Sequence, residues 1–243
     1  MKSDQAGARS AVFTPVDTQA RVDAVVRRLG DAIELGLLVE GEQLPGEADL
    51  AGRLGVSTVT LREALMALRQ QGFVTTRRGR GGGSFVTLPE GPAHGRLHTR
   101  LADWSTEELR DLGDHWAAVS GAAARLAAQR TEPGDLVQLW RTLDGLTVAD
   151  GPAARSRIHG RLHVELAAAA QSARLTREEV GIQREAGALL GLVLADADAH
   201  KDLCERHRNV ISAVQDGADD KARTAAEGCV LMSVTRLIEL RIA

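Results

Sequence analysis

Apolar residues recur every three or four positions along most of this chain, which is the spacing of one face of an α-helix. Short runs of the β-branched and aromatic residues typical of strands occur at 73–76 and 84–86, on either side of the Arg- and Gly-rich segment 77–83. The predicted helices span residues 18–36, 47–54, 58–71, 106–130, 133–148, 152–170, 176–196, 199–216 and 218–242. The chain is therefore expected to be mainly α, with one small β hairpin.

The order of elements between residues 47 and 86 predicts a winged helix-turn-helix. Gly55 suits the left-handed conformation that ends a helix, and Ser57 is a good N-cap for the helix that follows. That second helix is expected to turn one side to the core, with Val59, Leu65, Met66, Ala67 and Leu68 on or near it. Two short helices, a turn and a basic hairpin are the arrangement that places the second helix in a DNA major groove.

Positive charge is concentrated in the same segment. Between residues 53 and 86 there are six Arg and one acidic residue, Glu63, a local charge of +5 in a chain of net charge −3. Such a patch is typical of proteins that bind the phosphate backbone of nucleic acid. The alternative is a solvated basic helix beside a flexible Gly-rich loop.

Composition divides the chain further. Residues 87–101 contain two Pro and two Gly, which indicates a junction between domains. We expect a mobile arm over residues 1–19, a DNA-binding domain over 20–86, a linker over 87–103, and a C-terminal antiparallel all-α bundle of about six helices over 104–243. Two isolated Cys, no signal peptide and no apolar run of membrane-spanning length favour a cytoplasmic protein.

Three histidines of the bundle fall at positions where they could meet. His159 and His163 are four residues apart, so they share a helix face, and His207 lies on an apolar stripe of a later helix. Cys229 lies on the apolar stripe of the last helix. Three imidazoles and a thiol form a set suited to zinc or another late divalent metal. The alternative is that the histidines are hydrogen-bonded core residues and that Cys229 is a small apolar one.

The first domain resembles the DNA-binding domain of the GntR family of bacterial transcription regulators. The matching pieces are Gly41-Glu42-Gln43-Leu44-Pro45, Leu50 to Ser57, Arg62-Glu63-Ala64-Leu65, and Gly79 to Val86. The resemblance implies that the residues after the turn contact bases and phosphates and that the wing tip probes the minor groove. The positions so implied are Ser57, Thr58, Thr60, Arg62, Arg78, Gly79 and Arg80.

Two positions depart from the family pattern. Ala48 and Thr58 stand where family members usually carry Arg. Arginine is the side chain best suited to bidentate contacts with guanine. The resemblance therefore implies an operator that differs from the common family consensus, or weaker anchoring to phosphates.

The bundle resembles the ligand-sensing domain called FCD, found in the FadR branch of the same family. The matching pieces are Ala123 to Ala128, Leu162-His163 and Glu205-Arg206-His207. Many members of this branch bind a metal through one Asp and three His. The resemblance implies that His159 replaces the Asp, that His163 and His207 are retained, and that Cys229 replaces the last His.

The usual effector site is altered. Trp116 stands where the family carries an Arg that holds an effector carboxylate, and Ser172 where it carries an Asn. His115, Trp116 and Ser172 are therefore candidates for a changed effector pocket.

Together these patterns predict a homodimeric transcription regulator, a repressor, that binds a palindromic double-stranded DNA operator and is released by a small-molecule effector. No membrane partner is expected. The alternative is a metal-dependent hydrolase with a helical catalytic domain and an accessory nucleic-acid-binding module. It is disfavoured because no carboxylate beside the histidines is an obvious general base; Glu165, two residues from His163, points elsewhere.

Overall fold

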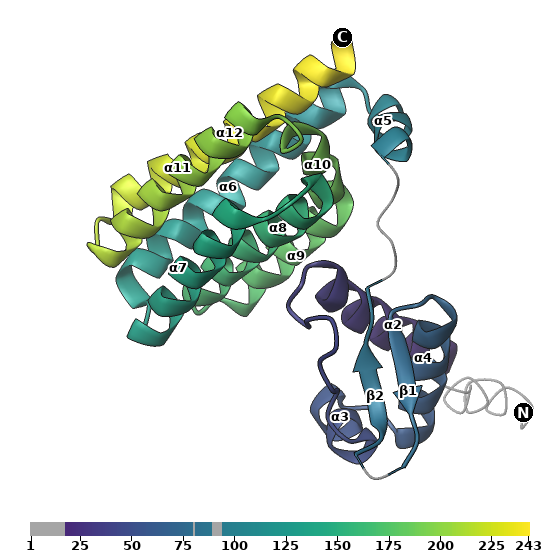
Figure 1. Ribbon diagram of the computed structural model, residues 1–243. Helices are drawn as coiled ribbons and strands as arrows, with labels where there is room; N and C mark the ends of the chain where they lie inside the picture. Colours follow the sequence, from purple (N-terminus) through teal and green to yellow (C-terminus); the bar gives the residue numbers. More distant parts are fainter. Residues whose placement is uncertain (1–17, 80, 89–93) are drawn as a thin grey trace, which may run out of the picture. The chain divides into compact units, whose positions relative to one another are not determined.

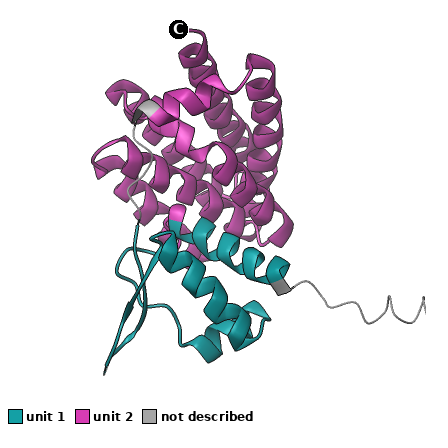
Figure 2. Cartoon of the chain, turned by 90° about the vertical axis from the view of Figure 1, so that its right-hand side faces the viewer, with its two compact units in different colours: residues 1–33, 38–89 teal, residues 34–37, 90–243 magenta. Residues whose placement is uncertain are grey.

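A computed structural model describes residues 18–79, 81–88 and 94–243, whose helices and strands are labelled in Figure 1. The chain forms two compact units, one of residues 1–33 and 38–89 and the other of residues 34–37 and 90–243 (Figure 2). Most of the arm expected over residues 1–19 lies outside the described residues, as does Arg80. Residues 18 and 19 are not part of an arm, because the first helix begins at Thr18.

The described residues of the first unit form three helices and one hairpin. The helices are α2 (Thr18–Glu34), α3 (Glu47–Leu54) and α4 (Thr58–Gln70), and the strands are β1 (Val74–Arg77) and β2 (Gly83–Val86). The strands are antiparallel, with Val74 opposite Val86 and Arg77 opposite Gly83. Buried aliphatic side chains from all three helices and both strands form one core. This is the winged helix-turn-helix that the sequence predicted.

The turn between α3 and α4 has the predicted chemistry. Gly55 is left-handed, with φ of 67°, and its N–H donates to the carbonyls that end α3. The Ser57 hydroxyl accepts the backbone N–H of Thr60 at 3.0 Å and so caps α4. The cap satisfies one of the amide groups that a helix leaves free at its start.

The predicted inner face of α4 is wrong at two positions. Val59 and Met66 are 60% and 53% exposed. Seven residues apart, they share a face, but it is the face opposite the core. The stripe that packs inward has the spacing i, i+3, i+4, i+7 and consists of Leu61, Ala64, Leu65 and Leu68.

The second unit is helical throughout its described part. Its elements are α5 (His94–Ala102), α6 (Thr106–Arg130), α7 (Pro133–Val148), α8 (Pro152–Ala169), α9 (Ala173–Ala186), a 3₁₀ turn (Gly187–Leu189), α10 (Leu190–Val193), α11 (Ala197–Gln215) and α12 (Asp219–Ile242). No helix of the described chain is both long enough and apolar enough to cross a membrane.

Two expectations for this unit were wrong. Residues 94–102, expected as linker, form α5, because Leu97 and Leu101 recur on one face and are buried in the bundle core. The single helix expected over 176–196 is instead α9, the 3₁₀ turn and α10. The break falls at Gly187, a residue of low helix propensity.

Close packing of α6 with α12, and of α8 with α6, α7 and α9, sets the interior of the bundle. Gly113 of α6 allows a near approach, since a Cβ added there would lie 3.0 Å from Cγ1 of Val234 on α12. Helix α8, which packs against α6, α7 and α9, has few exposed positions, and most residues from His159 to Ala170 are buried. The same core receives one face of α11, so residues on α8 and α11 can meet there.

Two glycines that precede α8 in the sequence, Gly145 and Gly151, allow a test of how backbone conformation affects stability. An added Cβ would have nothing within 4 Å at Gly145, inside α7, or at Gly151, which precedes α8 with φ of 77° and ψ of 153°. We expect Gly145→Ala to raise the free energy of unfolding by about 0.5–1 kcal/mol, because Ala is the better helix former. We expect Gly151→Ala to lower it by about 1–3 kcal/mol, because its backbone region is open essentially to Gly alone. Urea unfolding of both variants measures the two changes in the free energy of unfolding. Equal changes in the two variants would contradict the prediction.

Candidate DNA-binding surface and metal centre

The start of α4 presents most of the predicted DNA-contacting side chains to solvent. Ser57 and Thr58 are exposed, and the Arg62 side chain is 65% exposed and forms an ion pair with Glu47 of α3. Thr60 differs, since it is only 5% exposed and its hydroxyl lies 2.9 Å from that of Ser57. Its position is that of a capping and core residue, which does not suit the predicted contact with DNA.

The wing carries further cationic side chains. Arg78 is exposed, and Gly79 has φ of 99°, which allows the tight turn at the tip. The guanidinium of Arg77 lies 4.4 Å from the centre of the Phe85 ring, so a cation–π contact holds it along the hairpin. Sequence reasoning counted Arg77 in the local charge but did not select it as a site residue. Its place at the start of the Arg- and Gly-rich segment 77–83 was the available signal in the sequence.

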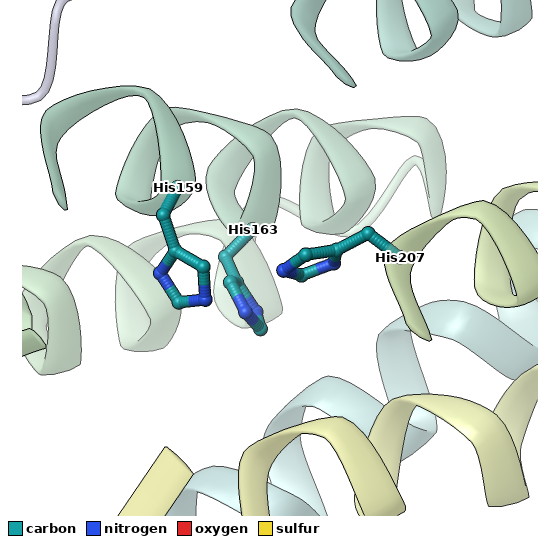
Figure 3. A group of neighbouring side chains, drawn as sticks. All are labelled: His159, His163 and His207. Carbon is teal, nitrogen blue, oxygen red and sulfur yellow. The ribbon is translucent and has the colours of Figure 1, made fainter. Parts of the chain in front are cut away.

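Three imidazoles meet inside the second unit, two from α8 and one from α11 (Figure 3). The ring centres of His159 and His163 are 4.7 Å apart, and that of His207 lies 5.0 and 5.1 Å from them. One nitrogen from each ring can be chosen so that all lie within 4.8 Å of one another. We call these residues the three-histidine cluster. The predicted convergence of the three histidines is present in the fold.

Burial keeps this cluster uncharged. His159 is fully buried, and His163 and His207 are each 3% exposed. Loss of hydration lowers the pKa of His163 to about 3 and lowers the pKa of His159 and His207 well below the ordinary range. Repulsion between the neighbouring rings adds to the shift of the latter two. Neutral imidazole is the form that binds metal ions.

Several ring nitrogens of the cluster have no hydrogen-bond partner within the described chain. They are both nitrogens of His159 and Nε2 of His163. A buried polar atom without a partner costs about 1–3 kcal/mol, so proteins seldom leave several together. A divalent metal would take up one lone pair from each ring, and three imidazole nitrogens are a donor set that suits zinc and similar ions. The residues present therefore fit a metal.

Cys229 does not join the cluster. Its Sγ contacts one member, at 3.7 Å from Nε2 and 3.9 Å from Nδ1 of His207, but it is not among the ligand atoms that all lie within 4.8 Å of one another. The side chain packs in the apolar core with Trp116 and Val230, and burial raises the pKa of its thiol to about 12. The sequence predicted four ligands, whereas the fold brings three together.

A buried carboxylate lies beside the cluster instead. Glu179 of α9 has no exposed surface, and its Oε1 is 3.7 Å from Nδ1 of His163. The sequence offered no obvious general base beside the histidines, and Glu179 was missed; Glu165 does point elsewhere, toward Arg161 and Gln138. Glu179 lies on the inward face of α9 with Ile182 and Ala186. A charged residue within an apolar stripe was the available signal.

The three residues suggested for an altered effector pocket lie apart. Trp116 is buried, with its ring centre 5.0 Å from that of His163. His115 is exposed and lines a hollow of about 360 Å³ with Trp104 and several acidic side chains. Neighbours on a helix point about 100° apart, which explains the separation. Ser172 accepts the backbone N–H of Leu175 and caps α9.

Comparison with known proteins gives the same two-part division. Residues 21–83 match the family described as bacterial regulatory proteins, gntR family, and residues 111–230 match the FCD domain. RmpR of Mycobacterium gastri, described as an HTH-type transcriptional regulator, is 35% identical over 96% of this chain and 86% of its own. The L-lactate dehydrogenase operon regulatory protein of Escherichia coli is 30% identical over 84% of this chain and 81% of its own.

A solved structure supports the fold. Escherichia coli McbR/YncC aligns with 90% of this chain and 97% of its own at a TM-score of 0.54 and 17% identity. Neither domain match is to an enzyme, so the hydrolase alternative finds no support. The chain belongs to the GntR family, in its FadR-like branch with an FCD domain, and is a DNA-binding transcription regulator.

Proposed function

We propose that this regulator binds a palindromic operator as a homodimer, with residues 20–86 on the DNA and residues 104–243 responsible for dimerisation and sensing. The observation that carries the proposal is the exposed, capped start of α4 next to a cationic wing. Each chain has one such reading helix, and a two-fold dimer of such chains requires a two-fold site. Binding of a small-molecule effector to the second unit would release the operator, which makes the protein a repressor.

The proposed contacts divide by chemistry. Ser57, Thr58 and Arg62, which are exposed, are proposed to contact bases and phosphates in the major groove. Arg78, Gly79 and Arg80 are proposed to reach the minor groove, and the held guanidinium of Arg77 adds a phosphate contact. Thr60 is left out of this set because its side chain is buried.

The second part of the proposal is a divalent metal, zinc by preference, held by His159, His163 and His207. Three buried, neutral imidazoles with unpartnered nitrogens support it. Bound there, the ion would supply a fixed positive charge and an open coordination position. The three side chains tie α8 to α11, and so would give the bundle a rigid centre through which an effector signal could pass.

Arg62 tests the DNA-binding surface. The operator is first identified by selecting, from random DNA sequences, those that the wild-type protein binds. We expect Arg62→Ala to weaken binding to this DNA by about 1–3 kcal/mol if the guanidinium contacts a base. The ion pair with Glu47 is exposed, so the variant should lose little folding stability. Arg174→Ala, an exposed Arg of α9 in the second unit, is the control and should bind as the wild type does. Unchanged binding by Arg62→Ala would rule out its assigned role; fluorescence anisotropy gives both affinities.

The buried histidines make the metal-free protein sensitive to acid. The pKa of His163 is about 3 in the folded state against 6.5 ordinarily, so between these values the unfolded chain binds more protons. The free energy of unfolding is therefore highest above pH 6.5 and should fall below it, by about 1.4 kcal/mol per pH unit for each such histidine. Urea unfolding with a chelator at pH 7.5 and 5.5 measures the fall. His163→Gln should show a smaller fall, and an equal one would contradict the assignment.

Metal content is the direct test of the second part. Protein purified without chelator or a nickel column should contain close to one equivalent of zinc per chain by elemental analysis. Because the ion binds the folded state, a chelator should lower the melting temperature and added zinc should restore it. His159→Ala should bind no zinc, while Cys229→Ser should still bind it, since Cys229 lies outside the cluster. Less than about a tenth of an equivalent, with no stabilisation by added zinc, would show that these histidines are core residues.

A further inference from the structure

Glu179 is the one buried carboxylate in the part of the chain that the structure describes. Burial of a charged or polar group is costly unless partners compensate it, and Glu179 has three. Its Oε1 accepts Nε1–H of Trp116 at 2.8 Å and the amide N–H of Gln183 at 2.9 Å, and its Oε2 accepts the hydroxyl of Ser120 at 3.1 Å. This arrangement fixes where the carboxylate points.

The carboxylate and Ser120 lie on one side of the His163 ring. Nδ1 of His163 is 3.4 Å from the Ser120 hydroxyl oxygen and 3.7 Å from Oε1 of Glu179. The other nitrogen, Nε2, is buried and has no partner among the described residues. A proton on Nδ1 is therefore next to acceptors, and the lone pair then falls on Nε2.

Charge gives Glu179 a second role. A divalent ion held by three neutral imidazoles would leave two positive charges in an apolar core, and an ion in such a medium needs a counter-charge. Cys229 touches His207, at 3.7 Å from Nε2, but it is not within reach of all three histidines. Glu165 is taken up by Arg161, at 2.7 Å. Glu179 is the remaining acid in contact with the cluster.

We propose that Glu179, assisted by Ser120, is a positioning residue of the three-histidine metal centre. It holds the proton of His163 on Nδ1, directs Nε2 to the ion, and offsets part of the ion's charge. A carboxylate behind a metal-binding imidazole fixes the ring and strengthens it as a ligand. This inference rests on the proposed metal centre, and it identifies a determinant of that centre that lies on α9, a helix with no histidine ligand.

The competing interpretation is that Glu179 only anchors Trp116 and Ser120 in the core. That role would affect the stability of the metal-free protein and leave zinc affinity unchanged. The zinc affinity of the metal-free full chain therefore separates the two interpretations. It is measured by competition with a chromophoric chelator.

Glu179→Gln retains the size and one acceptor oxygen, which can keep the hydrogen bonds from Trp116 and Gln183, but it replaces the other oxygen by a donor and removes the charge. We expect its zinc affinity to be about 10–100-fold weaker than that of the wild type, the usual effect of losing such a partner. Glu178→Gln is the matched control: the neighbouring side chain is 61% exposed, and its zinc affinity should not change. A folded Glu179→Gln variant that binds zinc as the wild type does would overturn the proposal. If Glu179→Gln does not fold, Ser120→Ala is measured instead, and it should also bind zinc more weakly than the wild type. Zinc affinity equal to that of the wild type in Ser120→Ala would likewise overturn the proposal.

A spectroscopic measurement reports the position of the proton. In the zinc-loaded wild type, imidazole ¹⁵N shifts should show His163 protonated at Nδ1 and bound through Nε2. Binding through Nδ1 would contradict the proposal even if Glu179→Gln lost affinity. Wild-type protein that takes up no zinc would refute the metal centre itself and this inference with it, whereas zinc-binding wild type with an unaffected Glu179→Gln refutes this inference alone.

Discussion

The second unit is organised around the burial of three imidazole rings in a core made mostly of aliphatic side chains. Burial keeps His159, His163 and His207 neutral and leaves several of their nitrogens without hydrogen-bond partners among the residues that the structure describes. The rings must come from two helices, so α8 and α11 have to pack at a fixed register against α6. The position of Trp116 and the buried network of Glu179 follow from the same requirement, because each borders the cluster.

In the first unit, a small core supports a helix whose outer face stays exposed. Inward-facing Leu61, Leu65 and Leu68 anchor α4, so its opposite face remains in solvent. That face carries Arg62 beside the exposed apolar side chain of Val59. The Ser57 cap fixes the start of the helix. Rigid support beneath an exposed helix start is what positions side chains for a DNA groove.

Much of this was predictable because it depends on local sequence. The bounds of α3, α6 and α7 follow from helical periodicity, from Gly55, and from capping residues such as Ser105. The convergence of His159 and His163 follows from four-residue spacing on one helix. The break after α9 and the helix α5 were missed, since short amphipathic segments acquire their structure from the core they join.

What the sequence determined by itself is the order of the longer elements, the basic segment and the identity of the candidate metal-ligating residues. These are set by backbone propensity and by chemistry carried within a few residues. The tertiary structure alone decided that Thr60 is buried, that Cys229 stays outside the cluster, and that Glu179 lies beside His163. Each of these depends on how helices distant in sequence pack side by side, and a rotation of one residue, about 100°, is enough to turn a side chain toward a site or away from it.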